Sequence, residues 1–550
     1  SYVLEEGDYK LYVGNSVKNT TKVEIEGKDA YYVEGLVIVE ELEEALAPIE
    51  SFTRMKPGIR KEDGSYEIVY VEVPKRTISL KERIEKNLPT VIKQTGDKGI
   101  KLKDVYEKKA SIEEFIAQLS NEELATIVRG EGMSSPHVTP GTASAFGGVG
   151  DSLRRYGIPI ACTADGPSGI RMESGLKSTQ VPIGTLLAST WNSELVEKLY
   201  VMEGKELKNN QIDTLLGPGL NIHRNPLNGR NFEYFSEDPL ITGIFAAANV
   251  KGIIAGGSKA TLKHFAANNQ EKARSFVDSI VSERALREIY LKGFEIAVKE
   301  GKADSIMTAY NPINGHWTAS NYDLNTTILR KEWGFKGIVM TDWWAKMNDT
   351  VVGGEADTKN TASMVRSQND LYMVVNNNGA DINPNEDNTL ESLKDGTLTV
   401  GELQRCAMNI CNFLLESQAL FRKHKNAEVV NKYEAIKKLE QDIKIQDIFE
   451  DSKVVISSDK PKSVFIKISK SGEHRIILKL AYDAFNLFQS ACNLTLNNKI
   501  VTTISANGTD GKWITQKLDR VELEEGYYEL KLDFVKPGMK IEWIDFVLVS

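Results

Sequence analysis

Hydrophobic and polar positions follow different patterns along the chain. Over residues 1–75 they alternate with a period of two, as at Tyr9, Leu11 and Val13 and in the run YYVEGLVIV. Successive side chains of a strand point to opposite faces, so this alternation predicts β-strands. Residues 76–110 are rich in Lys, Glu and Thr with weak periodicity, and we expect a connector with short helical pieces there.

From residue 111 to 400, short apolar runs alternate with amphipathic helical stretches. The predicted strands are Ile158–Ala164, Ile212–Gly217, Ala260–Phe265, Ser305–Tyr310, Gly337–Thr341 and Leu371–Val375. The predicted helices are Ser193–Asn209, Ser282–Glu300 and Asn325–Trp333. This βα repetition, with roughly 30 to 50 residues from strand to strand, predicts a parallel sheet and favours a TIM-type (β/α) barrel. The fold class is therefore α/β.

The last part of the chain changes pattern again. Residues 401–450 are predicted to be a helical segment. Residues 451–550 contain alternating runs such as KSVFIKI and HRIILKLAY, with NG and DG turn signals between runs. That combination predicts a separate β-sandwich of about 100 residues.

Composition excludes several classes of function. The chain has 68 Lys and Arg against 77 Asp and Glu, a formal charge of −9, so we expect no nucleic-acid partner. Four cysteines without a CxxC pair, and six scattered histidines, favour neither a disulfide framework nor a metal site. No uncharged apolar run reaches the ~20 residues that span a membrane. The most apolar stretch, 241–257, is broken by Lys251 and predicts a buried helix, and we expect no membrane partner and no cofactor.

Polar side chains follow several predicted barrel strands. Asp165 follows IPIACTA, Lys263 and His264 end KATLKHF, Tyr310 ends DSIMTAY, and Asp342 follows GIVMT. Each alone is more typical of a helix cap or a satisfied core residue. Together they indicate a site, because the carboxyl ends of barrel strands meet at one rim.

Five long motifs in this region identify a family by resemblance. They are LGPGLNIHRNPLNGRNFEYFSEDP, ATLKHFAANNQEKAR, VDSIVSERALREIYLKGFEIAVK, IMTAYNPINGHW and GFKGIVMTDWWA, with ADGPSGIR upstream of them. The chain resembles glycoside hydrolase family 3 over about 110–420, and the β-glucosidases within it. The resemblance implies a retaining glycoside hydrolase that releases β-linked glucose from the non-reducing end of β-glucosides by double displacement.

The resemblance also implies roles for individual residues. Asp342 is the expected nucleophile, because TDWW resembles the family's Ser-Asp-Trp motif with Thr341 in place of Ser. Trp343 is an expected aromatic wall for the sugar ring, and Trp344 is expected to narrow the mouth. The other implied sugar-binding or orienting residues are Asp165, Arg171, Arg230, Lys263, His264, Arg274 and Tyr310.

Two of these implied roles are specific. Asp165 is expected to accept hydrogen bonds from the hydroxyls at sugar carbons four and six. Arg274 is expected to help hold Asp342 ionised by lowering its pKa. The loop AANNQEKAR lacks the His of family members that act on N-acetylglucosamine, which disfavours that activity.

The family's general acid/base is a Glu from a second, α/β sandwich domain, and no second βα region follows residue 400. SYVLEEGDYKLYVGNS resembles the closing strands of the family's fibronectin-III-like domain, which implies an inverted domain order. We therefore expect the C-terminal piece of a split or cleaved enzyme, with a second polypeptide or fragment carrying the acid/base Glu. The carboxylates of this chain that stand near the motifs are the alternatives: Glu173, Glu233, Glu237 and Glu271.

Other readings stay open. One is a catalytically incomplete carbohydrate-binding subunit, and another is a family member with β-xylosidase-like sugar preference. A metal-dependent barrel hydrolase ranks last, since no HxH follows a first strand. Residues 451–550 resemble family 6-type carbohydrate-binding modules in their last strands, although Trp513 and Trp543 are also typical of core packing. We expect a cytoplasmic protein, and a homo-oligomer stays open.

Overall fold

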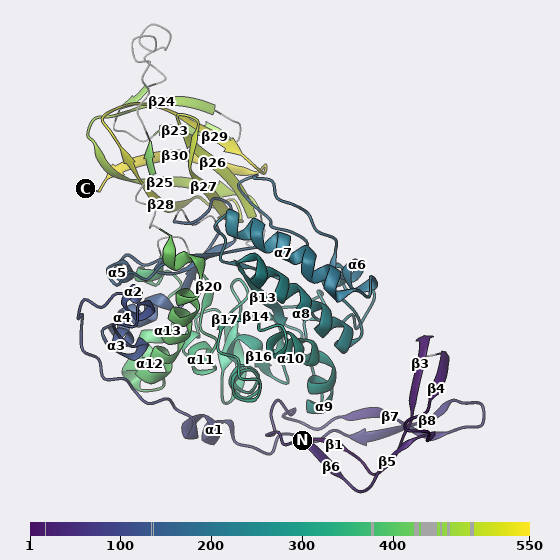
Figure 1. Cartoon of the computed structure of the whole chain (residues 1–550). Coiled ribbons are helices and arrows are strands. Elements are labelled where there is room, and N and C mark those ends of the chain that lie inside the picture. Colours follow the sequence, from purple (N-terminus) through teal and green to yellow (C-terminus); the bar gives the residue numbers. More distant parts are fainter. Residues whose placement is uncertain are drawn as a thin grey trace.

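A computed structural model describes the chain at residues 1–16, 18–133, 135, 137–375, 379–422, 428–430, 448–450, 454–458, 462–484 and 489–549. Figure 1 shows three parts: an N-terminal arm of paired strands, an α/β body, and a C-terminal β region on the opposite side of the body from the arm. The helical expectation for 423–427 and 431–447 lies outside the described residues.

The body is built around one eight-stranded sheet that nearly closes into a barrel. A parallel bridge between Met340 and Leu371 joins its first and last strands. The α/β prediction is confirmed. Five of the six predicted strands are present in shorter form, and β13 (Lys259–Phe265) begins one residue earlier than predicted. In sheet order the strands are β17 (Ile338–Met340), β14 (Ser305–Thr308), β13 (Lys259–Phe265), β12 (Thr214–Leu215), β11 (Ile160–Ala164), β10 (Ser144–Gly147), β9 (Arg129–Glu131) and β20 (Tyr372–Val375).

The prediction of a parallel sheet is wrong at β10, which pairs antiparallel with both β9 and β11. Neither β9 nor β10 was expected. Both are only three or four residues long and buried at every position, so they show no alternation of apolar and polar residues. Burial on both faces removes the period-two signal on which strand prediction depends.

Hydroxyl groups pair across the strands inside the sheet. Ser144 Oγ lies 2.7 Å from Thr163 Oγ1. Thr261 Oγ1 lies 2.8 Å from Thr214 Oγ1 and 2.9 Å from Ser305 Oγ. These buried hydroxyls therefore satisfy one another, which offsets the cost of removing them from water.

Helices α7 (Ser193–Asn209) and α8 (Pro239–Gly256) pack against each other outside the sheet. A Cβ on Gly256 would meet the Gly204 Cα at 2.5 Å, so glycine is required at this close approach. Helix α8 is long and apolar enough to span a membrane by composition, but 61% of it is buried inside the molecule, as expected for a core helix.

The remaining elements of the body are shorter than α7 and α8, and the longest of them is α13 (Val400–Leu415). The predicted helix Ser282–Glu300 is divided into α9 (Glu283–Ala285), a π-helical turn η2 (Leu286–Tyr290) and α10 (Lys292–Lys299). The predicted helix Asn325–Trp333 is the π-helix η4 (Asp323–Glu332). The others are α3 (Ile112–Ala117), α4 (Asn121–Ile127), α5 (Asp151–Arg154), α6 (Gly184–Ser189), η1 (Asn231–Glu233), β15 (Pro312–Ile313), β16 (His316–Trp317), η3 (Thr318–Ser320), β18 (Met347–Asp349), β19 (Gly353–Asp357), α11 (Thr361–Arg366), η5 (Ala380–Ile382), α12 (Thr389–Asp395), α13 (Val400–Leu415) and η6 (Gln418–Phe421).

The N-terminal arm is a set of antiparallel strand pairs, each a two-stranded sheet. The region forms strands, as the alternation predicts, and all six residues of Leu11–Ser16 and most large apolar side chains of the arm are exposed. The pairs are β1 (Tyr2–Leu4) with β6 (Val37–Glu40), β2 (Gly7–Tyr9) with β5 (Tyr31–Val33), β3 (Leu11–Ser16) with β4 (Asn19–Val23), and β7 (Thr53–Arg60) with β8 (Tyr66–Glu72).

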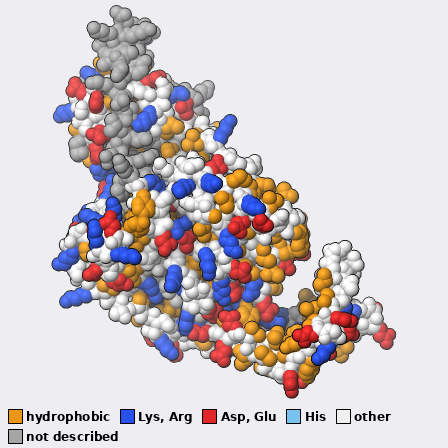
Figure 2. Space-filling model, in the orientation of Figure 1, with side chains coloured by type: hydrophobic (Ala, Val, Ile, Leu, Met, Phe, Trp, Pro, Cys, Tyr) orange, Lys and Arg blue, Asp and Glu red, His pale blue; other side chains and the backbone are white. Residues whose placement is uncertain are grey.

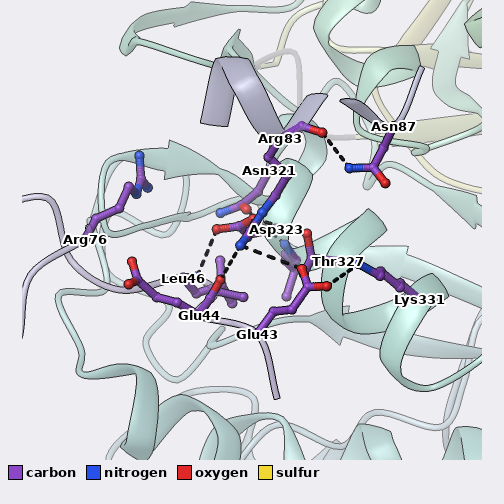
Figure 3. A network of polar contacts seen from close by, with 12 residues as sticks. Glu43, Glu44, Leu46, Arg76, Arg83, Asn87, Asn321, Asp323, Thr327 and Lys331 are labelled. Atoms are coloured by element: carbon purple, nitrogen blue, oxygen red, sulfur yellow. Dashed lines mark hydrogen bonds and ion pairs between the residues drawn. The ribbon is translucent and has the colours of Figure 1, made fainter. Parts of the chain in front are cut away.

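The connector contains α1 (Leu80–Lys86) and α2 (Leu102–Tyr106) and holds the arm to the body through Asp323 (Figure 3). Arg83 Nη1 lies 2.6 Å from Asp323 Oδ1, and Leu46 N donates to Asp323 Oδ2 at 3.1 Å. Arg83 also donates to the Glu44 carbonyl at 2.8 Å. One buried carboxylate thus fixes two separate segments at the base of the arm.

The C-terminal region has two five-stranded sheets whose inner faces share one apolar core. The helical prediction for 401–450 is wrong at β21 and β22, which join these sheets as edge strands. The first sheet runs β21 (Glu428–Val430), β28 (Ile514–Leu523), β25 (Gly472–Tyr482), β30 (Met539–Leu548), β23 (Val454–Ser458), and the second β22 (Ile448–Glu450), β24 (Lys462–Ile468), β29 (Gly526–Phe534), β26 (Gln489–Leu496), β27 (Lys499–Asn507).

Glu203 of α7 is a buried carboxyl whose two oxygens have no hydrogen-bond partner among the described residues. Burial raises its pKa to about 8, and Glu206 adds to the effect. The unfolded chain ionises this group near pH 4, so its contribution to stability falls as pH rises from about 4 to about 8. We expect Glu203→Gln to raise the free energy of unfolding at pH 8 by on the order of 3 kcal/mol.

Thermal unfolding of both proteins from pH 4 to pH 9 measures this difference. The gain should be absent at pH 4 and grow until about pH 8. Glu194→Gln on the same helix is the control, because the Glu194 side chain is 78% exposed and should leave the melting temperature within about 1 °C. A gain that does not depend on pH would contradict the prediction.

Candidate active site

A pocket of about 240 Å³ opens at the carboxyl ends of the barrel strands, and all nine residues expected to bind sugar or carry chemistry line it. Asp165 follows β11, Lys263 and His264 lie on β13, Tyr310 follows β14, and Asp342 follows β17. The other four come from loops at the same end of the sheet: Arg171, Arg230, Arg274 and Trp343.

Asp165 lies between two cations at one side of the pocket. Lys263 Nζ is 3.0 Å from Asp165 Oδ1, and Arg171 Nη2 is 3.0 Å from Asp165 Oδ2. Burial alone would raise the pKa of Asp165, but Lys263 and Arg171, with Arg230 nearby, hold it below its usual value. Asp165 is therefore an ionised acceptor at neutral pH, which gives strong hydrogen bonds to ligand hydroxyls.

Asp342 is the second aspartate that lines the pocket, with a residue exposure of only 7%. The Trp343 backbone N–H donates to Asp342 Oδ1 at 2.7 Å, and the Tyr310 hydroxyl also donates to this carboxylate. Burial raises the pKa of Asp342, while Arg230, the Trp343 N–H and Arg274 oppose it. Hydrogen-bond donors thus hold the carboxylate in place, but the donors and cations only partly offset the free-energy cost of removing its charge from water.

Arg274 lowers the pKa of Asp342, as expected, but burial outweighs the cations and the net pKa is raised. Arg274 also interacts with Glu271 and Tyr310. Its Nη1 lies 2.9 Å from Glu271 Oε2, and its guanidinium lies over the Tyr310 ring at 4.7 Å. Its positive charge is therefore only one of several that reach Asp342.

His264 is a neutral neighbour of Asp342, with Nε2 3.7 Å from Asp342 Oδ2. Burial lowers its pKa well below the usual value, and Arg230, Lys263 and Arg274 lower it further. Asn221 holds the His264 backbone from both sides: its Oδ1 accepts from the His264 N–H and its Nδ2 donates to the His264 carbonyl, each at 2.9 Å. His264 is thus a fixed, uncharged hydrogen-bonding group.

The pocket lining also contains residues that were not predicted from the sequence. Met133, Gly141, Ala143, Leu216 and Met307 also line the pocket. Leu216 and Met307 stand at or next to strands, so the inward positions of β12 and β14 could have indicated them. No sequence signal indicated the segment that contains Met133 and Gly141, because the strands on either side of it, β9 and β10, were not predicted. Trp344, expected at the mouth, is a lining residue.

The four glutamates considered as acids differ in position. Only Glu173 lines the pocket, and it is paired with Arg171 and with Lys536. Glu233 and Glu271 are paired with Arg230 and Arg274, respectively, and Glu237 is exposed. Ion pairing holds Glu173, Glu233 and Glu271 as orienting groups. In the described part of the chain, no cluster of three or more His, Cys, Asp or Glu could hold a metal ion.

These features define the class of protein. A polar pocket at the carboxyl rim of an α/β barrel presents three carboxylates, several cationic side chains and two tryptophans. That chemistry suits a neutral, polyhydroxylated ring and is the arrangement of a glycoside hydrolase barrel. The model of the glycosyl hydrolase family 3 N terminal domain matches residues 95–412, and the chain belongs to that family.

Three relatives illustrate the similarity. A beta-glucosidase of Ruminococcus albus is 43% identical over 99% of this chain and 57% of its own length. The crystal structure of a beta-glucosidase from Paenibacillus barengoltzii is 64% identical, with a TM-score of 0.80 over 99% of this chain and 59% of that one. Beta-glucosidase 3B from Thermotoga neapolitana, in complex with alpha-D-glucose, is 40% identical, with a TM-score of 0.51 over 57% of this chain and 43% of that one. The chain thus spans less than two thirds of the length of each of these relatives.

The raised pKa of Asp342 predicts that the ionised carboxylate lowers the stability of the folded protein. Ionising this carboxyl costs folding free energy at neutral pH, so Asp342→Asn should raise the melting temperature at pH 7. The cost disappears when the carboxyl is protonated in both states, so the two melting temperatures should converge as pH falls below about 4. Calorimetry across this pH range is the measurement, and a lower melting temperature for the variant at pH 7 would contradict it.

Proposed function

We propose that this chain carries the nucleophile and the sugar-binding half of a retaining β-glucosidase that releases β-linked glucose from the non-reducing end of β-glucosides. The observation that carries the proposal is that Asp342, a buried carboxylate held by donors, lines the same pocket as the ion-paired Asp165. The beta-glucosidase names of the relatives above support the substrate class. The similarity covers nearly the whole chain at 43% and 64% identity.

The proposed reaction is a double displacement. Asp342 attacks the anomeric carbon as the bond to the aglycone oxygen breaks, which leaves a covalent glycosyl-Asp342 intermediate. Water then attacks the same carbon and releases glucose. Tyr310 and the Trp343 N–H fix the attacking carboxylate, so that little reorganisation is needed in the transition state.

The sugar is proposed to lie between the two carboxylates. Asp165, ionised by Lys263 and Arg171, accepts from the hydroxyls at carbons four and six, which favours glucose over a xylose-type ring without carbon six. Trp343 supplies the apolar face. Arg230, neutral His264 and Arg274 supply the remaining polar contacts on the Asp342 side of the ring.

The proton for the leaving oxygen is proposed to come from a Glu outside these 550 residues, on a second polypeptide or segment with an α/β sandwich domain. Retention requires a second carboxyl group ~5–5.5 Å from the nucleophile, and it must be protonated to act as an acid. Two other carboxylates line the pocket in the described part of the chain, Asp165 and Glu173, and each is paired with two cations. The cations hold the pKa of Asp165 below its usual value, and the two ion pairs of Glu173 occupy both of its carboxylate oxygens.

Exposed apolar surface supports a partner. Trp191, Leu227 and Phe232 are 78%, 90% and 51% exposed, and Figure 2 shows apolar side chains gathered over the α6–α8 side of the body. The arm adds a second set of exposed apolar side chains along paired strands with free edges. Covering both by another polypeptide would bury surface that a monomer rarely leaves in water.

Leaving-group dependence tests the proposal. A 2,4-dinitrophenyl β-glucoside needs no proton on its leaving oxygen, whereas an alkyl β-glucoside does. We expect the chain alone to hydrolyse the first and to hydrolyse the second ~10²–10⁴-fold more slowly than when the partner is added.

Variants and sugars complete this test. Asp342→Asn should abolish both reactions, and Asp29→Asn on the exposed arm should change neither. A faster reaction with the matching xyloside would reassign the sugar preference. Sugar binding without turnover of either glucoside, with or without partner, would favour a carbohydrate-binding subunit instead. Full alkyl-glucoside turnover by the chain alone would place the acid within it.

A further inference from the structure

The C-terminal region contacts the sugar pocket directly. Lys536 Nζ, from the end of β29, lies 2.5 Å from Glu173 Oε2, and Ser505 Oγ of β27 donates to the Met133 carbonyl at 2.8 Å. Glu173 and Met133 both line the pocket. Asn493 Nδ2 of β26 also donates to the Ser174 carbonyl at 2.8 Å. Three strands of one sheet thus support the pocket rim from behind.

Lys536 is the outer end of a continuous row of alternating charges. Glu173 Oε1 lies 3.0 Å from Arg171 Nε, and Arg171 Nη2 lies 3.0 Å from Asp165 Oδ2. Asp165 Oδ1 is in turn 3.0 Å from Lys263 Nζ. The row runs from the C-terminal region to the carboxylate proposed to bind the sugar.

Glu173 is the most buried of the three charged groups nearest the C-terminal region, and its burial couples the two cations beside it. Its side chain is only 5% exposed, whereas Arg171 is 58% and Lys536 is 45% exposed. An exposed ion pair contributes little, but a buried carboxylate that loses one cation draws more strongly on the other. Glu173 therefore couples Lys536 to the position of the Arg171 guanidinium.

Both sides of this contact are fixed by the backbone. The Val535 N–H donates to the Ala491 carbonyl at 3.0 Å, and Ser490 Oγ donates to the Lys536 carbonyl at 3.1 Å. On the barrel side the Glu173 N–H donates to the Gly141 carbonyl at 2.8 Å. These backbone hydrogen bonds therefore fix the position of Lys536 relative to Glu173.

We propose that Lys536 is a positioning residue of the sugar pocket, which acts through Glu173 to leave Arg171 free to pair with Asp165. The C-terminal region is then a working part of the sugar site and not an appended module. This inference rests on the proposed function, because it concerns how tightly the same pocket holds its sugar. Without Lys536, the Arg171 guanidinium turns towards Glu173, and Asp165 loses one of its two cations.

The test uses trapping of the glycosyl-enzyme by 2,4-dinitrophenyl 2-deoxy-2-fluoro-β-glucoside, which requires no acid. An Asp342 carboxylate oxygen bonds to the anomeric carbon, and the bonding electrons leave with dinitrophenolate. The dependence of inactivation rate on probe concentration separates the binding constant from the limiting rate. We expect Lys536→Met to weaken binding about three- to tenfold, roughly the loss of one modest polar interaction, with the limiting rate within about twofold.

Control variants make the result specific. Lys536→Arg keeps the charge and should restore binding to within about twofold of the parent chain. Lys531→Met removes a lysine of β29, the strand that precedes Lys536; Lys531 is 44% exposed and paired with Asp533, and its loss should have no effect. Lys536→Met should also add nothing to the loss caused by Glu173→Gln, since both act along one row.

The outcomes separate the two ideas. If the full chain is labelled at Asp342 and Lys536→Met binds the probe as well as the parent chain, the positioning role is overturned. It is also overturned if Lys536→Arg is as weak as Lys536→Met. If the parent chain is not labelled at all, the proposed function fails. The positioning role is then decided by a thermal double-mutant cycle between Lys536→Met and Arg171→Met, where zero coupling would overturn it.

Discussion

Closure of the eight-stranded sheet is the constraint on which the rest of the molecule depends. The seam between β17 and β20 is held by the buried carboxylate of Asp370, which accepts from the Val339 N–H at 2.8 Å and from Asn409 Nδ2 at 2.8 Å. Arg330 pairs with the same carboxylate at 2.5 Å. The Thr341 N–H, one residue before Asp342, donates to the Leu371 carbonyl across this seam at 2.9 Å. Because the seam brings the last strands back to the first, polar groups from β11, β13, β14 and β17 face one pocket.

The surroundings of Asp165 and Asp342, two of the carboxylates that line that pocket, shift their pKa values in opposite directions. Asp165 is in contact with two cations, which outweigh the cost of burial and lower its pKa. Asp342 has donors and more distant cations, so burial dominates and raises its pKa. An acceptor that binds hydroxyl groups gains from being firmly ionised. A nucleophile gains from a poorly solvated charge that is neutralised when the covalent bond forms.

The parts outside the barrel depend on it in different ways. The C-terminal sheets have their own apolar core but contact the pocket rim through Lys536, Ser505 and Asn493. The arm has no such core among its described residues and is held to the body at its base, around Asp323. Its exposed apolar side chains are consistent with a surface that another polypeptide covers.

Local patterns in the sequence determined the class of fold, most barrel strands, the helix Ser193–Asn209 and the residues at strand ends, because period-two and period-3.6 signals and motif spacing are local properties. Only the tertiary structure decided the antiparallel β10, the exposure of the arm, the strands β21 and β22, and the raised pKa of Asp342. Each of these depends on which distant segments exclude water from a group or pair with its backbone. Burial and pairing are sums over such neighbours, and a local stretch of sequence does not contain them.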